Sequence, residues 1–142
     1  MQPSCDFVSL HFPSHLKTTR NTIAKTEIQR LVEGSESALS HADIQIALKG
    51  LCDRVTIYRV LDRLVEDGII HRIVNVDGVV CYARCHKCED GHNHHHDHVH
   101  FSCNNCKTVT CLDNVVPSFK MPRKYKVAEV NFTVSGLCPD CV

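Results

Sequence analysis

Three segments in the first half of the chain carry apolar residues at the spacing of an amphipathic helix. The first, TTRNTIAKTEIQRLVEG, begins just after residue 17 and ends at Gly34. The second, SHADIQIALKG, opens with Ser40 and has Asp43 in a capping-box position. The third spans residues 53–67 and places large apolar residues at i, i+3, i+4 and i+7, which predicts one buried face: Ile57, Val60, Leu61 and Leu64.

Two short runs with β-strand character follow the third helix. They read IIHRIV and VVCYA and are joined through NVDG, in which Asp77-Gly78 is a strong turn signal. Helices followed by a hairpin predict a winged helix-turn-helix over residues 17–83. We expect residues 1–16 to form a poorly ordered tail.

The second half of the chain has a different composition. Residues 84–97 lack apolar periodicity and predict a hinge with a histidine-rich loop. Beyond them, VHFSC, KTVTCL and KYKVAEVNFTVSGLC predict strands, with an irregular or short helical connection broken by Pro117 and Pro122. Residues 98–142 hold few large apolar side chains, so we expect a small domain that needs a staple or a partner chain. The fold class is predicted as α+β.

Composition singles out the metal-binding residue types. The 142 residues include ten cysteines and eleven histidines, and the formal net charge is zero. The N-terminus has no basic segment followed by an apolar run, and no stretch approaches eighteen apolar residues. We therefore expect a cytoplasmic protein with neither a secretory signal nor a membrane segment. In that compartment such cysteines bind metal more often than they form disulfides.

Two C-x-x-C pairs make the strongest candidate metal site. Thiolates at i and i+3 in a tight turn can face one ion, and two such pairs complete a tetrahedral zinc site. A disulfide framework and an iron–sulfur cluster are the weaker alternatives. The separation between the pairs suggests an intervening strand hairpin. The predicted ligands of this structural zinc are Cys103, Cys106, Cys138 and Cys141.

A second candidate site lies in HNHHHDHVHFSCNNC, residues 92–106, which holds six histidines. His98 and His100 alternate in a predicted strand, so both imidazoles can point to one ion. The consecutive histidines before them cannot all face one metal from a regular element and are typical of a mobile, low-affinity tract. We expect at most an accessory metal site there: His94, His95, His96 and Asp97.

The exposed side of the third helix offers side chains suited to DNA. An arginine such as Arg59 can bind guanine edges or phosphate, and a tyrosine ring such as Tyr58 can contact thymine methyl groups. The alternative is an ordinary amphipathic helix with solvated charges, which the winged-helix context weakens. The predicted DNA contacts are Lys17, Arg20, Arg54, Thr56, Tyr58 and Arg59.

The segments VTIYRVLDRLVEDGIIHRI, YARC, HHHDHVHFSCNNC and GLCPDC together resemble the ferric uptake regulator family of metal-dependent repressors, along residues 17–142. The resemblance implies an N-terminal winged-helix DNA-binding domain and a C-terminal α/β dimerisation domain. It also implies a structural four-cysteine zinc, a sensory metal site at the hinge, and a homodimer on a pseudo-palindromic double-stranded DNA operator.

Cys85 lies three residues after Tyr82 at the hinge. A cysteine at this position is similar to the motif of the zinc uptake regulator branch, whereas iron and peroxide sensors have carboxylates among their hinge ligands. Relatives commonly have an acid at the position of His71, so a solvated wing residue is the alternative role of that histidine. The alternative function is an iron- or peroxide-responsive repressor of the same family, with iron(II) at the sensory site. The sensory zinc ligands implied by the resemblance are His71, Cys85, His98 and His100.

Other functional classes fit the sequence less well. The motifs H-E-x-x-H and H-x-E…P-C-x-x-C do not occur, so we do not expect a zinc hydrolase or deaminase. A zinc-buffering protein would explain the histidine tract but not the exposed face of the third helix. The cysteines in apolar surroundings are expected to be small core residues: Cys52, Cys81 and Cys111.

Overall fold

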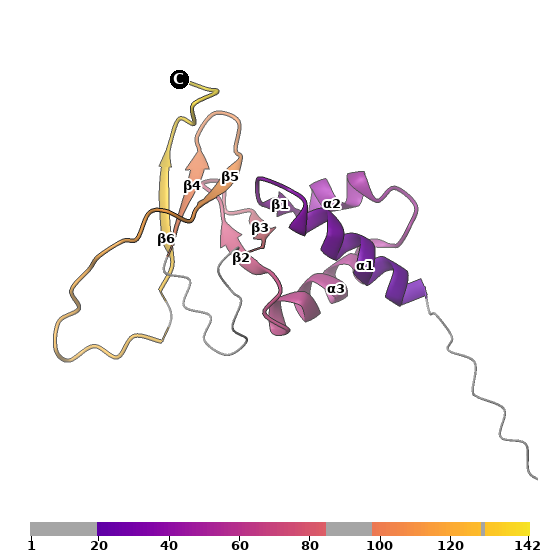
Figure 1. Ribbon diagram of the computed structural model, residues 1–142, viewed down its shortest axis with the longest axis horizontal. Helices are drawn as coiled ribbons and strands as arrows, with labels where there is room; N and C mark the ends of the chain where they lie inside the picture. The colour runs from indigo at the N-terminus through magenta and orange to yellow at the C-terminus, as the bar shows by residue number, and fades with distance from the viewer. Residues whose placement is uncertain (1–19, 85–97, 129) are drawn as a thin grey trace, which may run out of the picture.

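The computed structural model describes residues 20–84, 98–128 and 130–142. Its helices are α1 (Arg20–Glu33), α2 (His41–Ala47) and α3 (Arg54–Glu66). Its strands are β1 (Leu39–Ser40), β2 (His71–Val74), β3 (Val80–Ala83), β4 (Val99–Cys103), β5 (Val109–Leu112) and β6 (Phe132–Gly136). The helices gather at one end, the sheet β1-β3-β2 lies in the middle, and the sheet β5-β4-β6 lies at the other end (Figure 1). None of the described helices is long and apolar enough to cross a membrane.

Side-chain caps fix where α2 and α3 begin. The Asp43 backbone N–H donates to the Ser40 hydroxyl and the Ser40 backbone N–H donates to the Asp43 carboxylate, so the predicted capping box is present. Asp53 caps α3 by accepting a 2.7 Å hydrogen bond from the Thr56 backbone N–H. Gly68 follows α3 with a φ of 69°, which a glycine adopts without strain.

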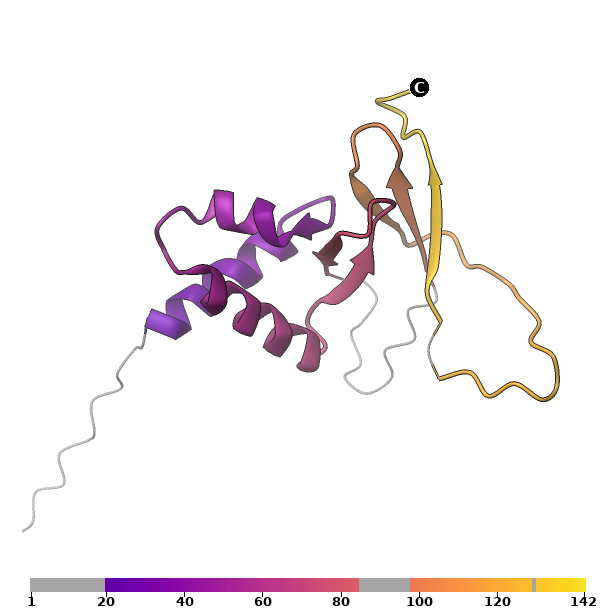
Figure 2. The ribbon, with the colours of Figure 1, turned by 180° about the vertical axis from the view of Figure 1, so that it is seen from behind.

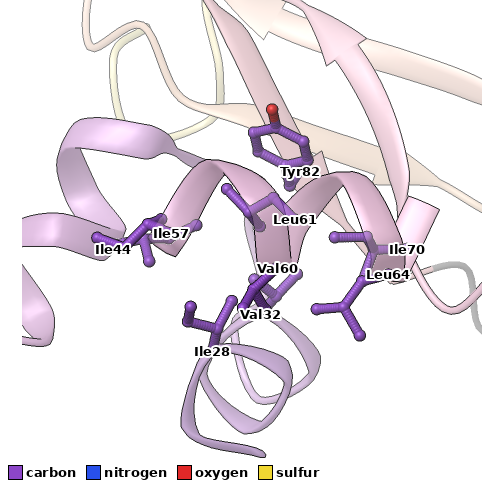
Figure 3. Packing of buried hydrophobic residues seen from close by; sticks show 9 residues of the cluster. All are labelled: Ile28, Val32, Ile44, Ile57, Val60, Leu61, Leu64, Ile70 and Tyr82. Atoms are coloured by element: carbon purple, nitrogen blue, oxygen red, sulfur yellow. The ribbon is translucent and has the colours of Figure 1, made fainter. Parts of the chain in front are cut away.

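The apolar face of α3 forms the centre of the N-terminal core. Its four predicted residues are all buried, and Leu61 and Leu64 have no exposed surface. Side chains from both other helices and from the sheet surround this face. Figure 3 shows the cluster around it, which includes Ile28, Val32, Ile44, Ile70 and Tyr82.

The hairpin β2–β3 occupies the position of the predicted wing. The two strands pair antiparallel, with His71 opposite Ala83. The side-chain oxygen of Asn75 closes the turn by accepting hydrogen bonds from the backbone N–H groups of Asp77 and Val79, both at 2.9 Å. The two-residue strand β1, which the sequence did not predict, adds to the other edge of β3.

The C-terminal sheet corrects one sequence prediction. Its central strand β4 is antiparallel to β5 and parallel to β6, so the hairpin expected between the cysteine pairs is wrong. Two strands can pair in parallel only if a long connection brings the chain back to the end of the sheet where the first strand began. Part of that connection here is the long segment between β5 and β6, which extends away from the sheet (Figures 1 and 2). Strands are the regular elements within described residues 98–142, and together with the three helices before them they give the chain the predicted α+β fold.

The wing hairpin packs directly against the C-terminal sheet. The Val76 backbone N–H donates to the buried Ser102 hydroxyl at 3.2 Å, and Lys107 forms a 3.1 Å ion pair with Asp77. The backbone of Ala38 also donates to the carbonyl of Val109 at 2.8 Å. These contacts surround a second apolar cluster that draws on both sheets: Ala38, Ile73, Cys81, Ala83 and Val109.

We expect Leu64→Ala to lower the free energy of unfolding by about 2–5 kcal/mol, because it leaves a cavity in a fully buried part of the core. Urea denaturation would measure the change. Val55→Ala is the matched control, since Val55 lies on the same helix but is 56% exposed. Its expected effect is roughly 0.5 kcal/mol or less. Equal losses for both variants would contradict the assigned core.

Candidate metal centres and nucleic-acid interface

Two cysteine pairs from distant parts of the chain meet at one end of the C-terminal sheet. Cys103 ends β4, and Cys106 lies in the turn that follows it. Cys138 and Cys141 follow β6. Because β4 and β6 run parallel, both pairs emerge at the same end of the sheet. The four sulfur atoms all lie within 4.8 Å of one another.

The sulfur spacing fits a tetrahedral zinc site. The Sγ atoms of Cys106 and Cys138 are 3.7 Å apart. Zinc–sulfur bonds of about 2.3 Å would place two ligands of a tetrahedron roughly 3.8 Å apart. None of the cysteines in the described part of the chain forms a disulfide. The residues present therefore fit a single zinc bound by four sulfurs.

Hydrogen bonds distribute protons unevenly among these thiols. Several hydrogen bonds lower the pKa of Cys103 to about 6, and the largest contribution comes from the Cys138 backbone N–H, which donates to Cys103 Sγ at 3.5 Å. Hydrogen bonding to the Cys141 thiol, followed by desolvation and the thiols of Cys103 and Cys106, raises the pKa of Cys138 to about 12. Four adjacent thiolates repel one another, so ionisation of the whole set requires a cation. Metal binding there would release the protons that the thiols retain.

A second cluster consists of three buried imidazoles and one thiol. His71 comes from β2, while His98 immediately precedes β4 and His100 lies within it. Their exposed fractions are 5%, 7% and 2%, and their ring centroids lie 4.5 to 5.3 Å apart. The thiol is that of Cys111, which lies on β5 directly opposite His100. The four ligand atoms are all within 4.8 Å of one another.

The distances within this cluster also suit zinc. His71 Nε2 is 3.0 Å from His100 Nε2 and 3.8 Å from Cys111 Sγ. Ligands of a tetrahedral zinc lie roughly 3.3 Å apart for two nitrogens and roughly 3.5 Å apart for nitrogen and sulfur. Burial, and secondarily the charge of Asp113, raise the pKa of Cys111 to about 11. The thiol therefore keeps its proton at neutral pH until a metal displaces it.

The cluster differs from the predicted ligand set in its thiol. The three predicted histidines lie together, but the described cysteine beside them is Cys111. Cys111 packs against the second apolar cluster, as expected of a small core residue, and its sulfur also lies 3.8 Å from His71 Nε2. The predicted metal ligands that lie outside the described part of the chain are Cys85, His94, His95, His96 and Asp97.

Strand alternation was the signal that could have identified Cys111. In the segment TVTC, Val109 and Cys111 share one face of β5. The sequence did not reveal that β5 pairs with β4 in the register that sets Cys111 beside His100. The other two cysteines expected in the core do pack there: Cys81 is buried in the second apolar cluster, and Cys52 packs against the first.

The predicted DNA-binding side chains of α3 lie on its outer surface. Arg54 and Arg59 are exposed, and Tyr58 is 40% exposed. Thr56 is half-buried beside the cap formed by Asp53. Two predicted contacts have no described side chain: Arg20, of which only the helical backbone in α1 is described, and Lys17, outside the described residues.

One acidic residue next to this surface, Asp62, is paired. Asp62 forms an ion pair with Arg72 of the wing strand β2. A guanidinium group beside this carboxylate offsets its charge, so Asp62 opposes an approaching phosphate less than a lone acid would. Positive charge on the exposed side of α3 is thereby maintained at Arg54 and Arg59, although the chain as a whole has a formal net charge of zero.

Comparison with known proteins gives one curated sequence match and several similar structures, and no family model matches the chain. The ferric uptake regulation protein of Bacillus subtilis (strain 168) is 26% identical over 140 residues, covering 93% of this chain and 89% of that protein. A zinc uptake regulator complexed with zinc and DNA superposes with a TM-score of 0.58 at 23% identity, covering 82% of this chain and 79% of that one. The ferric uptake regulator from Francisella tularensis with iron gives a TM-score of 0.57 at 20% identity, covering 96% and 98%. The chain is therefore similar in sequence, along nearly its whole length, to a ferric uptake regulation protein, and it shares the fold of iron and zinc uptake regulators.

Proposed function

We propose that this chain is a metal-responsive, DNA-binding transcriptional repressor of metal-uptake genes, and that zinc is the metal it senses. One observation carries the proposal. His71 from the wing converges with His98, His100 and Cys111 from the C-terminal sheet, so a single ion can be bound by both parts of the molecule at once. In this proposal residues 17–83 bind DNA, residues 84–97 form the hinge and histidine-rich loop, and residues 98–142 dimerise.

The coupling between metal and DNA follows from where the ligands lie. A zinc ion would supply one positive centre shared by three imidazoles and a thiolate. His100 and Cys111 lie on the C-terminal sheet and His98 immediately precedes it, whereas His71 lies on the other sheet. Binding of all four to a common ion would therefore fix the relative orientation of the two sheets. In a dimer that orientation sets the distance between the two copies of α3. Metal then favours the form that matches two operator half-sites.

The donor set favours zinc over iron(II). Three imidazoles and a thiolate are soft to borderline ligands in the number that zinc prefers, whereas carboxylates suit harder ions. The described cluster contains no carboxylate. Iron(II) remains the alternative sensed metal, because the curated sequence relative is a ferric uptake regulation protein. A zinc-buffering role, the other alternative, does not require the exposed arginines of α3.

The proposed homodimer is supported by the surface of the C-terminal part. Large apolar side chains lie exposed along the segment from β5 to the end of the chain, and soluble monomers rarely leave such groups unpaired over a wide area. Strand β6 also forms an edge of its sheet. Among the described residues these exposed side chains include Val116, Phe119, Tyr125, Val134 and Leu137.

We expect Tyr58→Ala to weaken binding to a specific operator by ~1–3 kcal/mol, the usual worth of a good base contact. Fluorescence anisotropy with a duplex selected from a random pool by the zinc-loaded protein would measure it. Ile46→Ala is the control, since Ile46 is 63% exposed on α2 and lies outside the predicted contact set. Unchanged operator affinity in folded Tyr58→Ala would refute the placement of α3 on DNA.

We expect Cys103→Ser to lower the zinc content by about one ion per chain and to destabilise the C-terminal sheet, because metal binding at such a site contributes folding free energy. Elemental analysis and thermal unfolding would measure both effects. Cys52→Ser is the matched control, because Cys52 packs against the N-terminal core and belongs to neither candidate metal centre. Full zinc content in folded, dimeric Cys103→Ser would exclude the structural site.

We expect Cys111→Ser to abolish the zinc dependence of operator binding, a loss of roughly 5–150-fold in affinity at saturating zinc. The four-cysteine zinc and the dimer should remain. Anisotropy at buffered free zinc would measure the affinity, with Cys52→Ser again as the control. The matched variant Cys85→Ser tests the ligand implied by the family resemblance.

If Cys85→Ser removes the zinc response and Cys111→Ser does not, Cys85 is the fourth ligand and the described thiol is only a neighbour. Retention of the zinc response by His71→Ala and His100→Ala would move the sensory site elsewhere. Stronger activation by iron(II) than by zinc at equal buffered free concentrations would favour the iron-responsive alternative.

A further inference from the structure

The tyrosine of α3 is held by an aromatic neighbour from α2. The rings of His41 and Tyr58 are stacked, with centroids 3.8 Å apart and planes inclined by 22°. The guanidinium carbon of Arg54 lies 5.7 Å from the centre of the same tyrosine ring, and an Arg54 N–H donates to the tyrosine hydroxyl at 3.4 Å. Two side chains therefore limit the orientation of Tyr58, and only one of them, Arg54, belongs to the same helix.

The backbone around His41 is itself fixed. His41 is the first residue of α2 and directly follows Ser40, which caps that helix and pairs with Cys81 as part of β1. The imidazole Nε2 lies 3.2 Å from the backbone carbonyl oxygen of Arg54. A carbonyl oxygen only accepts, so Nε2 must carry the hydrogen in this contact. The ring is thus connected to the sheet on one side and to the first turn of α3 on the other.

The stack borders a groove that opens to solvent beside the wing. The groove has a volume of about 420 Å³ and lies between the start of α2, the exposed side of α3 and strand β3. Its lining includes Gln45 together with Val79 and Val80, both exposed on the wing. Because Tyr58 remains 40% exposed while its ring is stacked, part of the ring stays available to a ligand that enters this groove.

We propose that His41 is a positioning residue for DNA recognition, which holds Tyr58 in one orientation so that its contact with a base is formed before DNA binds. The inference rests on the proposed DNA-binding function. Pre-organised side chains lose less conformational freedom on binding, and this benefit applies only where Tyr58 makes its specific contact. His41 therefore raises the affinity for the operator relative to unrelated DNA, without contacting phosphate itself.

The test compares two duplexes of equal length, one selected from a random pool by the wild-type protein in zinc and one with the same bases scrambled. His41→Ala should lower the ratio of the two affinities about 2- to 10-fold, the worth of one aromatic pair. Affinity for the scrambled duplex and its salt dependence should stay at the wild-type values. His41→Phe retains a ring for stacking and loses the hydrogen-bond donor, so it should keep most of the ratio. Ile46→Ala, on the same helix α2 as His41, is the control for the general effect of an alanine substitution on that helix.

A double-mutant cycle separates positioning from other roles. In the Tyr58→Ala background, His41→Ala should cause no further loss, because no ring remains to be positioned. Additive losses would overturn the proposal. So would an equal loss on both duplexes with a salt slope reduced by about one, which marks a phosphate contact. An unchanged ratio in His41→Ala, or a loss in His41→Phe as large as in His41→Ala, would also overturn it.

The result for Tyr58→Ala alone shows whether only the role of His41 is wrong or the proposed DNA-binding function is wrong as well. If Tyr58→Ala lowers the ratio and His41→Ala does not, α3 reads DNA and only the role of His41 is wrong. If Tyr58→Ala leaves the ratio at the wild-type value, the placement of α3 on DNA fails, and the role of His41 fails with it.

Discussion

The apolar contact between the wing hairpin and the C-terminal sheet fixes the position of His71 relative to the other candidate ligands. Ile73 lies two residues after His71 on β2, and Val109 lies two residues before Cys111 on β5. Residues at i and i+2 of a strand share one face, so each ligand stands beside a residue that packs in the shared cluster. Burial of the cluster therefore positions the ligands, and a change in its packing would displace them.

Strand β4 connects the two candidate metal centres. His100 and Cys103 lie on the same strand but on opposite faces, because they are three positions apart. One face contributes His100 to the histidine cluster and Ser102 to a hydrogen bond with the wing. The other ends in Cys103, which is fully buried and belongs to the four-cysteine cluster. A metal bound by the four cysteines would hold the ends of β4 and β6 together, and so would stabilise the strand that carries His100.

The core and the candidate DNA surface are two faces of the same helix. Leu61 and Leu64 hold α3 against α1 and α2, while Arg54, Tyr58 and Arg59 point outward. Because the buried face fixes the helix in the domain, movement of the whole N-terminal part carries the outward side chains with it. The contact between the wing and the C-terminal sheet thus determines how the candidate metal centre and the DNA surface are related in space.

Local patterns in the sequence were enough to predict the three helices, the capping box, the buried face of α3 and the wing hairpin, since each depends on residues a few positions apart. Spacing also identified the four cysteines, together with His98 and His100, as candidate ligands, whereas His71 was implied only by the family resemblance. Only the tertiary structure decided that β4 pairs in parallel with β6, that β5 lies on the opposite edge, and that Cys111 stands beside His100. Alternation along a strand determines which side chains share a face, but the neighbouring strand and its register depend on contacts between residues far apart in the chain.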